Sequence, residues 1–220
     1  EKNDYVISEG IWSHLATADE VDKSFLNEQI DRFKLYSNKV RSKIDSIELI
    51  HIEPSGSILR YDNDYFNTVR PGISLYGATP FGSPSTDLKP VMEFRAPIAL
   101  IKSIPLSSSV GYNRTYIASN DMKIALVQGG YADGIPTSFS NKGHISFNNQ
   151  IARIIGKVAF DLTTIDISAL EECREFDYVT FWGGKNNNVR IEIIAKKCDC
   201  NPYELFTGVS KRVKRTYIYD

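Results

Sequence analysis

The sequence contains few of the residues that build disulfide frameworks, metal sites and membrane spans. There are three cysteines and three histidines in 220 residues. The odd cysteine count and the spacing Cys198-Asp199-Cys200 fit neither a disulfide framework nor a zinc site. No apolar run is long enough to cross a bilayer, and Glu1-Lys2-Asn3-Asp4 does not begin a signal peptide. We therefore expect no metal and a reducing, cytoplasmic compartment, while a membrane domain upstream in a longer protein stays open.

An excess of charge of either sign is also missing. Lys and Arg number 26 against 27 Asp and Glu, which gives a formal net charge of −1. Such a balance provides no electrostatic reason to bind nucleic acid or an anionic membrane, so a small molecule is the expected partner. With 42% hydrophobic and 24% charged residues, the chain predicts one large or two modest globular domains.

The first 80 residues predict alternating strands and helices. Strand patterns cover residues 10–15, 47–52 and 65–69, helical spacing covers 22–44 with Asp22 as its expected N-cap, and a helical turn is expected at 58–60. This order is typical of a parallel α/β sheet or barrel. Three strands are too few for an eight-stranded barrel, so we interpret residues 1–80 as the C-terminal part of an α/β (TIM) barrel.

Polar residues with site chemistry follow the ends of these strands. His14, the Ser55-Gly56 loop and Arg70 all occur there, which is where α/β proteins place their sites. Arg70 carries a permanent cation, and Gly72 allows a close backbone approach that leaves amides for an anion. Taken locally, Arg70-Pro71-Gly72 also fits an ordinary turn after a strand with a surface ion pair.

The rest of the chain has a different pattern. Residues 81–92 have linker composition, and residues 93–220 predict an all-β domain, either a barrel or a sandwich of mainly antiparallel strands. The end of this domain is expected to be helical again, near residues 190–197 and 202–205. The strand patterns, separated by glycine- and asparagine-rich turns, are 93–101, 123–128, 144–147, 151–155, 163–167 and 178–182.

Five blocks in this order resemble the C-terminal part of an alanine racemase. They cover nearly the whole chain. The blocks are Ser13-His14-Leu15-Ala16-Thr17-Ala18-Asp19-Glu20, Val69-Arg70-Pro71-Gly72-Ile73-Ser74-Leu75-Tyr76-Gly77, Val110-Gly111-Tyr112, Gly130-Tyr131-Ala132-Asp133-Gly134 and Gly156-Lys157-Val158-Ala159-Phe160-Asp161.

The resemblance implies a pyridoxal 5'-phosphate enzyme of fold type III. Such an enzyme has an N-terminal α/β barrel and a C-terminal β domain, and it acts as a head-to-tail homodimer on a small amino acid. It would supply D-alanine for peptidoglycan. The family's cofactor lysine lies in a Lys-x-x-Ala-Tyr-Gly-His-Gly motif that this sequence does not contain. We therefore expect the chain to be a fragment, inactive alone.

The resemblance also implies roles for individual residues. Ser55 and the amides of Gly72 and Ile73 match the phosphate grip, and Arg70 matches the arginine that faces the pyridine nitrogen of the cofactor. Because arginine stays protonated, it would donate a hydrogen bond there and keep the electron sink weak. Tyr112 matches the second acid-base group, which reaches the active site of the partner subunit. Its ordinary pKa of about 10 requires an environment that favours the phenolate.

His14 matches a family histidine between this tyrosine and the arginine, so Tyr112, His14 and Arg70 are the expected catalytic residues. Phe160 and Asp161 match the family's Met-Asp pair at the substrate carboxylate, and Tyr131 matches a tyrosine that lines the entrance.

Two departures from the family concern the pocket. Phe160 replaces the usual methionine, and Lys211 stands where we expect the tyrosine that contacts the cofactor phosphate. A lysine would still bind phosphate as a point charge. Both changes leave open a serine racemase of the vancomycin-resistance type.

Other readings remain at this stage. A non-catalytic pyridoxal-phosphate-binding relative would need neither Tyr112 nor His14, and a decarboxylase relative would need no tyrosine on the opposite face. His51 and His144 are expected to be structural, and Asp133 is expected to belong to a turn.

Overall fold

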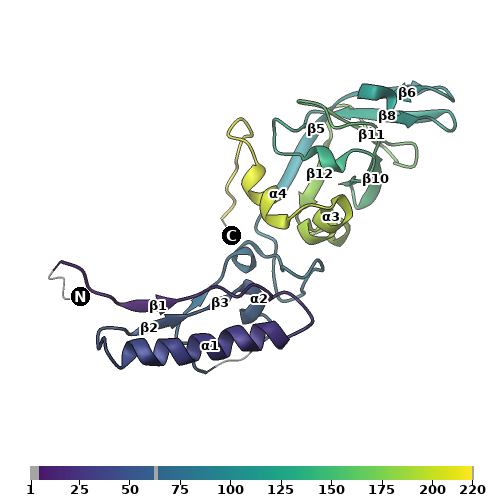
Figure 1. The fold of residues 1–220 in the computed structure, drawn as a ribbon. Coiled ribbons are helices and arrows are strands. Elements are labelled where there is room, and N and C mark those ends of the chain that lie inside the picture. Colours follow the sequence, from purple (N-terminus) through teal and green to yellow (C-terminus); the bar gives the residue numbers. More distant parts are fainter. Residues whose placement is uncertain (1–4, 62–63, 220) are drawn as a thin grey trace. The chain divides into compact units, whose positions relative to one another are not determined.

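The computed structural model describes residues 5–61 and 64–219. The chain forms two compact units, Glu1–Phe81 and Gly82–Asp220. Figure 1 shows that short strands and a long helix make up the first unit, whereas strands dominate the second. The predicted order, an α/β part followed by a mainly antiparallel β part, is confirmed.

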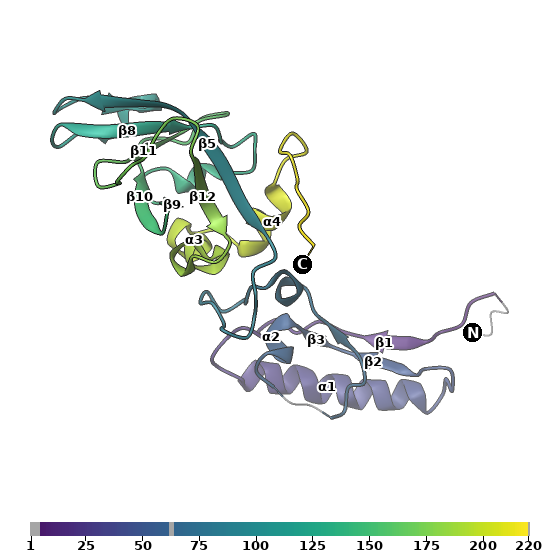
Figure 2. The same cartoon turned by 180° about the vertical axis from the view of Figure 1, so that it is seen from behind.

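The first unit is built from parallel strand pairs beside a helix. Strand β1 (Gly10–Trp12) pairs with β2 (Leu49–His51), and β3 (Glu53–Pro54) pairs with β4 (Val69–Arg70), both in parallel. Figures 1 and 2 show helix α1 (Ser24–Arg41) running alongside these strands. Parallel strands connected through a helix are the expected fragment of an α/β barrel.

Helix α1 forms where apolar residues recur at helical spacing. Leu26, Ile30 and Phe33 face the core of the unit, which also contains Ile50 and Phe66. The N-cap residue is Lys23 rather than the predicted Asp22, and Lys23 makes no side-chain capping bond. Asp22 nevertheless stabilises the start of the helix, because its Oδ1 accepts the amide of Ser24 at 2.9 Å.

The segment before β4 packs against α1 instead of extending the strand. The rings of Phe33 and Phe66 lie 5.8 Å apart, and the Tyr65 hydroxyl lies 2.7 Å from Ser37 Oγ. Asn67 substitutes for strand backbone: its Oδ1 accepts the amide of Ile50 at 2.8 Å, and its Nδ2 donates to the carbonyl of Glu48 at 2.7 Å. The predicted strand at 65–69 is therefore wrong except at its last residue.

The two short helical elements of this unit lie at the strand ends. Helix α2 (Ser55–Ile58) begins directly after Pro54, whose backbone is extended. The helix therefore starts earlier than the turn predicted at 58–60. The 3-10 helix η1 (Ile73–Tyr76) follows Gly72 and ends at Gly77, whose φ is 74°. These two elements carry the serines of the candidate site described below.

The second unit is a closed six-stranded barrel, so the barrel alternative is confirmed over the sandwich. Its strand order is β10-β11-β8-β5-β12-β9, and β9 pairs with β10 to close it. All its pairings are antiparallel. The barrel strands are β5 (Glu93–Ile104), β8 (Met122–Val127), β9 (His144–Phe147), β10 (Gln150–Ile154), β11 (Thr163–Asp166) and β12 (Tyr178–Gly183).

Apolar side chains on alternate strand positions fill the barrel. Ile98, Val127, Ile165 and Phe181 are all fully buried, as expected when one face of each strand points inward. Strand β12 carries an irregularity between Thr180 and Trp182 where it pairs with β5. Such an extra residue bends a strand and helps a small barrel to close.

Outside the barrel, the sequence pattern missed one hairpin. Strands β6 (Ser109–Val110) and β7 (Tyr116–Ile117) pair in antiparallel fashion around η2 (Tyr112–Arg114). Each strand has only two residues, too few for an alternating pattern to be visible. The remaining elements are η3 (Thr137–Phe139), η4 (Asn187–Val189), α3 (Ile191–Cys198) and α4 (Pro202–Gly208), and both α-helices lie close to their predicted positions.

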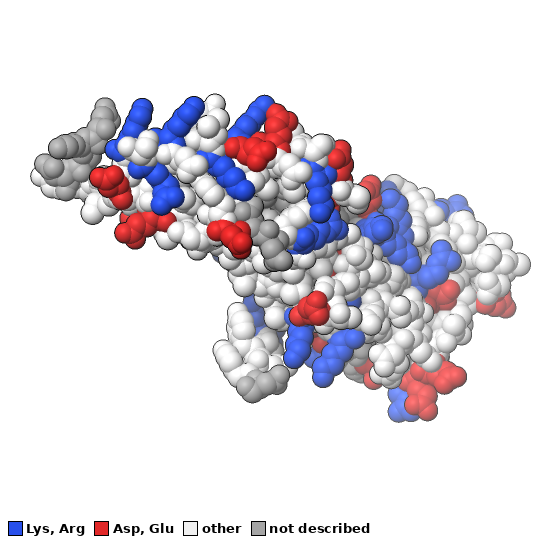
Figure 3. Space-filling view, turned by 90° about the horizontal axis from the view of Figure 1, so that it is seen from below, with Lys and Arg blue, Asp and Glu red and all other residues white. Residues whose placement is uncertain are grey.

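The surface carries charges of both signs. Figure 3 shows Lys and Arg side chains intermixed with Asp and Glu side chains over the face in view. Within residues 5–61 and 64–219, none of the helices combines the length and apolar character needed to span a bilayer.

Candidate active site

In the first unit, the arginine and the histidine expected to act together are in contact. Nη2 of Arg70 lies 3.2 Å from Nδ1 of His14 and 2.5 Å from the carbonyl oxygen of Ser13. Because a guanidinium can only donate, His14 Nδ1 must be the acceptor. A neutral His14 in this contact carries its proton on Nε2, and that N–H is available to donate onward.

The backbone around His14 is held by helix α1. Gln29 Oε1 accepts the amide of Ala16 at 2.9 Å, and Gln29 Nε2 donates to the carbonyl of His14 at 3.4 Å. One side-chain amide therefore satisfies the peptide groups on both sides of Leu15, which is itself buried. This arrangement fixes the strand end from which His14 projects.

One buried donor of Arg70 has no partner. Its Nε is buried, and no hydrogen-bond partner lies within reach among the described residues. The ring of Trp12 covers the guanidinium, with the Arg70 Cζ atom 4.7 Å from the ring centroid. A buried N–H without an acceptor is costly, so this atom points to a ligand acceptor at the site.

His51 lies near the same cation. Burial lowers the pKa of His51, and the positive charge of Arg70 lowers it further. The Nδ1 atom of His51 is buried without a hydrogen-bond partner among the residues described. A neutral imidazole beside Arg70 adds no second positive charge to the site.

Hydroxyl and amide groups converge on Ser55 at the next strand end. Ser55 Oγ accepts the amide of Gly72 at 2.8 Å, and it lies 3.0 Å from Ser74 Oγ and 3.3 Å from the amide of Ser74. The Gly72 amide, expected to be available, is thus bound to Ser55 in this conformation. The cluster offers several hydrogen-bond donors and no side-chain cation, a chemistry that suits an anion bound by dipoles.

A buried carboxyl group lies beside this cluster. Glu53 is 6% exposed, and its Oε1 accepts a hydrogen bond from Ser57 Oγ at 3.2 Å. Burial raises the pKa of Glu53, while the Ser57 hydroxyl acts in the opposite direction. A negative charge at this position would oppose a phosphate, so the neutral acid is the form compatible with an anion at Ser55.

In the second unit, Tyr112 projects from a tight loop. Gly111 precedes it with a φ of 75°, and Asn113 and Arg114 follow with φ values of 59° and 51°. A side chain at Gly111 would lie 3.0 Å from the amide nitrogen of Lys157, so this close approach requires glycine. Tyr112 is 70% exposed, so its own unit does not enclose it.

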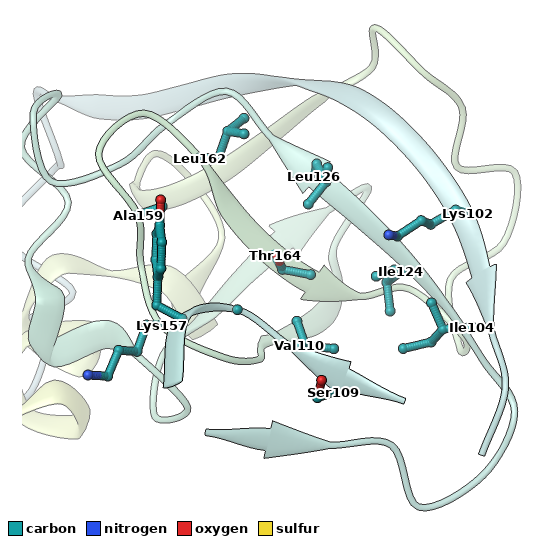
Figure 4. Close-up of a pocket in the computed structure, with 12 residues that line it drawn as sticks. Lys102, Ile104, Ser109, Val110, Ile124, Leu126, Lys157, Ala159, Leu162 and Thr164 are labelled. Carbon is teal, nitrogen blue, oxygen red and sulfur yellow. The ribbon is translucent and has the colours of Figure 1, made fainter. Parts of the chain in front are cut away.

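A cavity of about 430 Å³ opens beside Tyr112. Figure 4 shows Lys102 and Lys157 on opposite sides of it and apolar residues between them. Besides Tyr112 and the two lysines, its lining includes Ile104, Val110, Ile124, Leu126 and Leu162. The cavity therefore combines an apolar surface with two ammonium groups and a phenol.

The residues expected at the substrate entrance form a second exposed group. The rings of Tyr131 and Phe160 lie 5.6 Å apart in an edge-to-face arrangement. Arg212 covers the ring of Phe160, with its Cζ atom 5.4 Å from the ring centroid. The Nε atom of Arg212 lies 3.1 Å from Asp133 Oδ1. Asp133 also accepts the amide of Gly130, which confirms its turn role.

Gly130 permits this arrangement. A Cβ atom at Gly130 would lie 2.3 Å from the carbonyl oxygen of Ala159, a distance that no side chain tolerates. The loop containing Tyr131 therefore lies directly on the segment that ends in Phe160. Two further backbone bonds join them, from Tyr131 to Ala159 and from Ala132 to Phe160.

Three expected site residues remain to be placed. Asp161 is exposed next to Phe160, and Lys211 is exposed in the turn after α4. Ile73 begins η1 and is buried, with 1% of its surface exposed. Among the described residues, no group of three or more His, Cys, Asp and Glu could hold a metal ion.

The sequence interpretation missed several residues that contact the predicted ones. Trp12 covers Arg70, Gln29 holds His14, Ser74 joins Ser55, and Arg212 covers Phe160. Trp12 and Ser74 stand inside or next to blocks already singled out, so proximity along the chain could have found them. Gln29 offered no such signal, because it occupies an ordinary helical position.

Comparisons with known proteins identify both parts of the chain. Residues 1–80 match the family model described as "Alanine racemase, N-terminal domain", and residues 91–217 match "Alanine racemase, C-terminal domain". An alanine racemase 2 from Caldanaerobacter subterraneus subsp. tengcongensis is 38% identical over 214 residues, which cover 96% of this chain and 55% of that protein. An alanine racemase from Vesicomyosocius okutanii is 38% identical over 213 residues, 96% of this chain and 57% of that protein.

Solved structures agree. The alanine racemase from Bartonella henselae with covalently bound pyridoxal phosphate superposes with a TM-score of 0.84 at 31% identity, covering 96% of this chain and 56% of that one. The alanine racemase from a D-cycloserine-producing Streptomyces lavendulae superposes with a TM-score of 0.88 at 31% identity, covering 97% of this chain and 57% of that one. This chain thus spans a little over half the length of the relatives it matches.

Proposed function

Because this chain belongs to the alanine racemase family, we propose that it forms part of an enzyme that interconverts L- and D-alanine with pyridoxal 5'-phosphate. The observation that carries the proposal is the contact between Arg70 and His14 at 3.2 Å, with Arg70 Nε left buried and without a partner. That donor fits the acceptor nitrogen of a pyridine ring. The domain limits we propose for this part of the enzyme are 1–80, a linker at 81–92 and 93–220.

The residues present fit the cofactor. Ser55, the amide of Gly72 and the start of η1 at Ile73 would hold its phosphate, with Ser74 as a further hydroxyl. Arg70 would donate to its ring nitrogen, and we retain Lys211 as a cationic phosphate contact. When bound, the cofactor supplies the electron sink that makes the α-hydrogen of the amino acid acidic. The cofactor lysine itself would come from a segment outside this sequence.

We propose a two-base mechanism in which a lysine and Tyr112 serve opposite faces of the α-carbon. The exposed Tyr112 would enter the active site of a partner subunit in a head-to-tail homodimer. There, the Nε2–H of His14 would donate to the oxygen of Tyr112 of the partner subunit, and this bond favours the phenolate. Arg70 supports it by occupying His14 Nδ1, which keeps the proton on Nε2. The phenolate then accepts the α-proton, and the phenol returns one in the reverse direction.

The substrate would be a small amino acid. Phe160, Asp161 and Tyr131 would line its carboxylate and entrance, and we propose that D-alanine made here supports peptidoglycan synthesis. Serine is the second candidate substrate, because Phe160 stands where the family usually has a methionine. Relative kcat/KM values for alanine and serine decide between them.

The proposal is tested in the complete, cofactor-loaded protein with Tyr112→Phe. This change removes only the phenol oxygen, so most racemisation should be lost while the absorbance of the bound cofactor stays as in the wild type. Phe retains the ring, so we expect the variant to fold, and thermal unfolding checks this. Unchanged racemisation would refute the assignment. We also expect the 220-residue chain alone, supplied with pyridoxal phosphate, to show no turnover.

A further inference from the structure

A second aromatic feature of the first unit has no role in the proposed chemistry so far. Trp12 ends strand β1 and is 62% exposed. An indole this exposed normally loses the benefit of burial, but one face of Trp12 is covered by the guanidinium of Arg70 at 4.7 Å. Tryptophan is the aromatic residue that binds a cation most strongly through its face.

Three consecutive residues of one strand end hold the same guanidinium. Ser13 and His14 both bind Nη2, through a carbonyl oxygen and an imidazole nitrogen. Trp12 contacts the face of the group instead. The polar contacts at a single nitrogen hold one corner of the guanidinium. A ring against the face restricts the remaining tilt of its plane.

The tilt of this plane determines where the buried donor points. Arg70 Nε is buried and has no partner among the described residues, so it is a donor available to a ligand. An Nε–H projects in the guanidinium plane, so a ring that sets the plane also sets the direction of this hydrogen bond.

We propose that Trp12 is a positioning residue that aligns Arg70 Nε–H with a heteroaromatic nitrogen acceptor. The assignment rests on the proposed function, which supplies the pyridine nitrogen of the cofactor as that acceptor. Trp12 acts through Arg70 alone and needs no contact with substrate. It thereby controls both the affinity for the cofactor and the strength of the electron sink that Arg70 keeps weak.

The test compares Trp12→Leu and Trp12→Phe in the complete protein. Leucine keeps apolar bulk but has no ring face, whereas phenylalanine keeps a face. The matched control is Tyr36→Leu, which removes another exposed aromatic residue of the same unit that covers a cation, Lys39, at 5.4 Å. Thermal unfolding is measured for each variant, so that loss of folding is recognised.

Three readouts follow. The dissociation constant of pyridoxal phosphate is measured by equilibrium dialysis, the bound cofactor by its absorbance band, and the chemistry by the ratio of transamination to racemisation. For Trp12→Leu we expect an affinity about tenfold weaker, a displaced absorbance band and a larger share of transamination. Trp12→Phe should restore most of each value, and Tyr36→Leu should match the wild type.

A purely structural role gives a different result. If Trp12→Leu changes thermal stability but leaves affinity, absorbance and the transamination share unchanged, the inference is wrong. If Trp12→Leu does not fold, the affinity for pyridoxal phosphate is compared among Trp12→Phe, Arg70→Lys and the variant with both changes. If the effects of the two single substitutions simply add in the double variant, coupling between Trp12 and Arg70 is contradicted. A wild-type protein that binds no pyridoxal phosphate would instead refute the proposed function together with this inference.

Discussion

Gln29 donates its side-chain amide to the carbonyl of His14, at 3.4 Å, from a position on helix α1. With the bond that it accepts from Ala16, this contact couples the helix to the residue that we place beside Arg70. A helix outside the site therefore determines the backbone geometry inside it.

Replacing Gln29 by leucine should destabilise this strand end. Two peptide groups lose their partners, so we expect a loss of about 1 to 2 kcal/mol in the free energy of unfolding and a lower kcat. Denaturant titration and steady-state kinetics measure both. The control is Glu28→Gln on the same helix, which removes only the exposed pair with Arg32 and should change stability by less than about 0.5 kcal/mol. Equal effects of the two changes would argue against a positioning role for Gln29.

Ser55 and Ser74 should contribute to binding of the cofactor phosphate and not to binding of the pyridine ring. We expect Ser55→Ala to weaken binding of pyridoxal phosphate about tenfold, because a charge-assisted hydrogen bond is lost. Ser74→Ala should have a smaller effect in the same direction. Binding of pyridoxal, which lacks the phosphate, serves as the internal control and should be unaffected in both variants. A similar loss for both ligands would place the serines outside the phosphate site.

Glu53 should make the stability of the first unit depend on pH. Burial raises the pKa of this carboxyl above its ordinary value of 4.5, so the folded chain binds the proton more tightly than the unfolded chain. Stability contributed by the neutral acid is present below pH 4.5 and is lost as the pH rises through the higher, folded-state pKa. Glu53→Gln should remove this loss and stabilise the protein at neutral pH. Urea unfolding at several pH values checks it against the exposed Glu48→Gln, which should keep the wild-type slope.

Much of this architecture could be predicted from the sequence because its signals are local. The short apolar run of Met122–Val127 and the apolar spacing of Leu26, Ile30 and Phe33 indicate strand and helix directly. What could not be predicted depends on single contacts between distant residues. Asn67 replaces strand backbone at Glu48 and Ile50, and nothing in residues 65–69 reveals that the rings of Tyr65 and Phe66 turn toward α1.

The candidate site also contains residues that the sequence pattern locates and residues that it does not. His14, Ser55 and Arg70 stand at strand ends that the pattern locates, and the structure brings His14 and Arg70 into contact. The partners that orient them, Trp12 and Gln29, are ordinary residues by type and spacing. Their importance lies in the direction of a ring face and of an amide group, which no residue pattern encodes.

Phe160 should influence the choice between alanine and serine. Phe160→Met removes the ring that lies between Tyr131 and Arg212, so both side chains lose a contact. We expect the ratio of kcat/KM for alanine to that for serine to rise about threefold or more, which corresponds to roughly 0.6 kcal/mol or more of lost ring interactions. The matched control is Tyr178→Met, which removes an exposed ring near Arg95 in the same unit. An unchanged ratio would separate Phe160 from substrate choice.

The three cysteines should differ little from inert apolar residues in the folded protein. Burial raises the pKa of Cys198 to about 12, with the neighbouring Cys200 adding to the rise, and burial also raises the pKa of Cys173. Thiolate is the reactive form, so iodoacetamide at pH 8 should leave Cys198 unmodified in the native protein. Mass spectrometry after labelling should find all three modified once guanidinium is added. Rapid native labelling of Cys198 would show that the second unit opens locally.

Closure of the barrel sets an order of events during synthesis. Strand β12 (Tyr178–Gly183) pairs with both β5 (Glu93–Ile104) and β9 (His144–Phe147). The barrel therefore cannot close before β12, its last strand, has emerged from the ribosome. Until then, β5 and β9 present unpaired edges of the kind that associate between chains. Pairing between segments so far apart in sequence is also slow compared with local folding. The nascent second unit therefore exposes these strand edges until β12 has been translated.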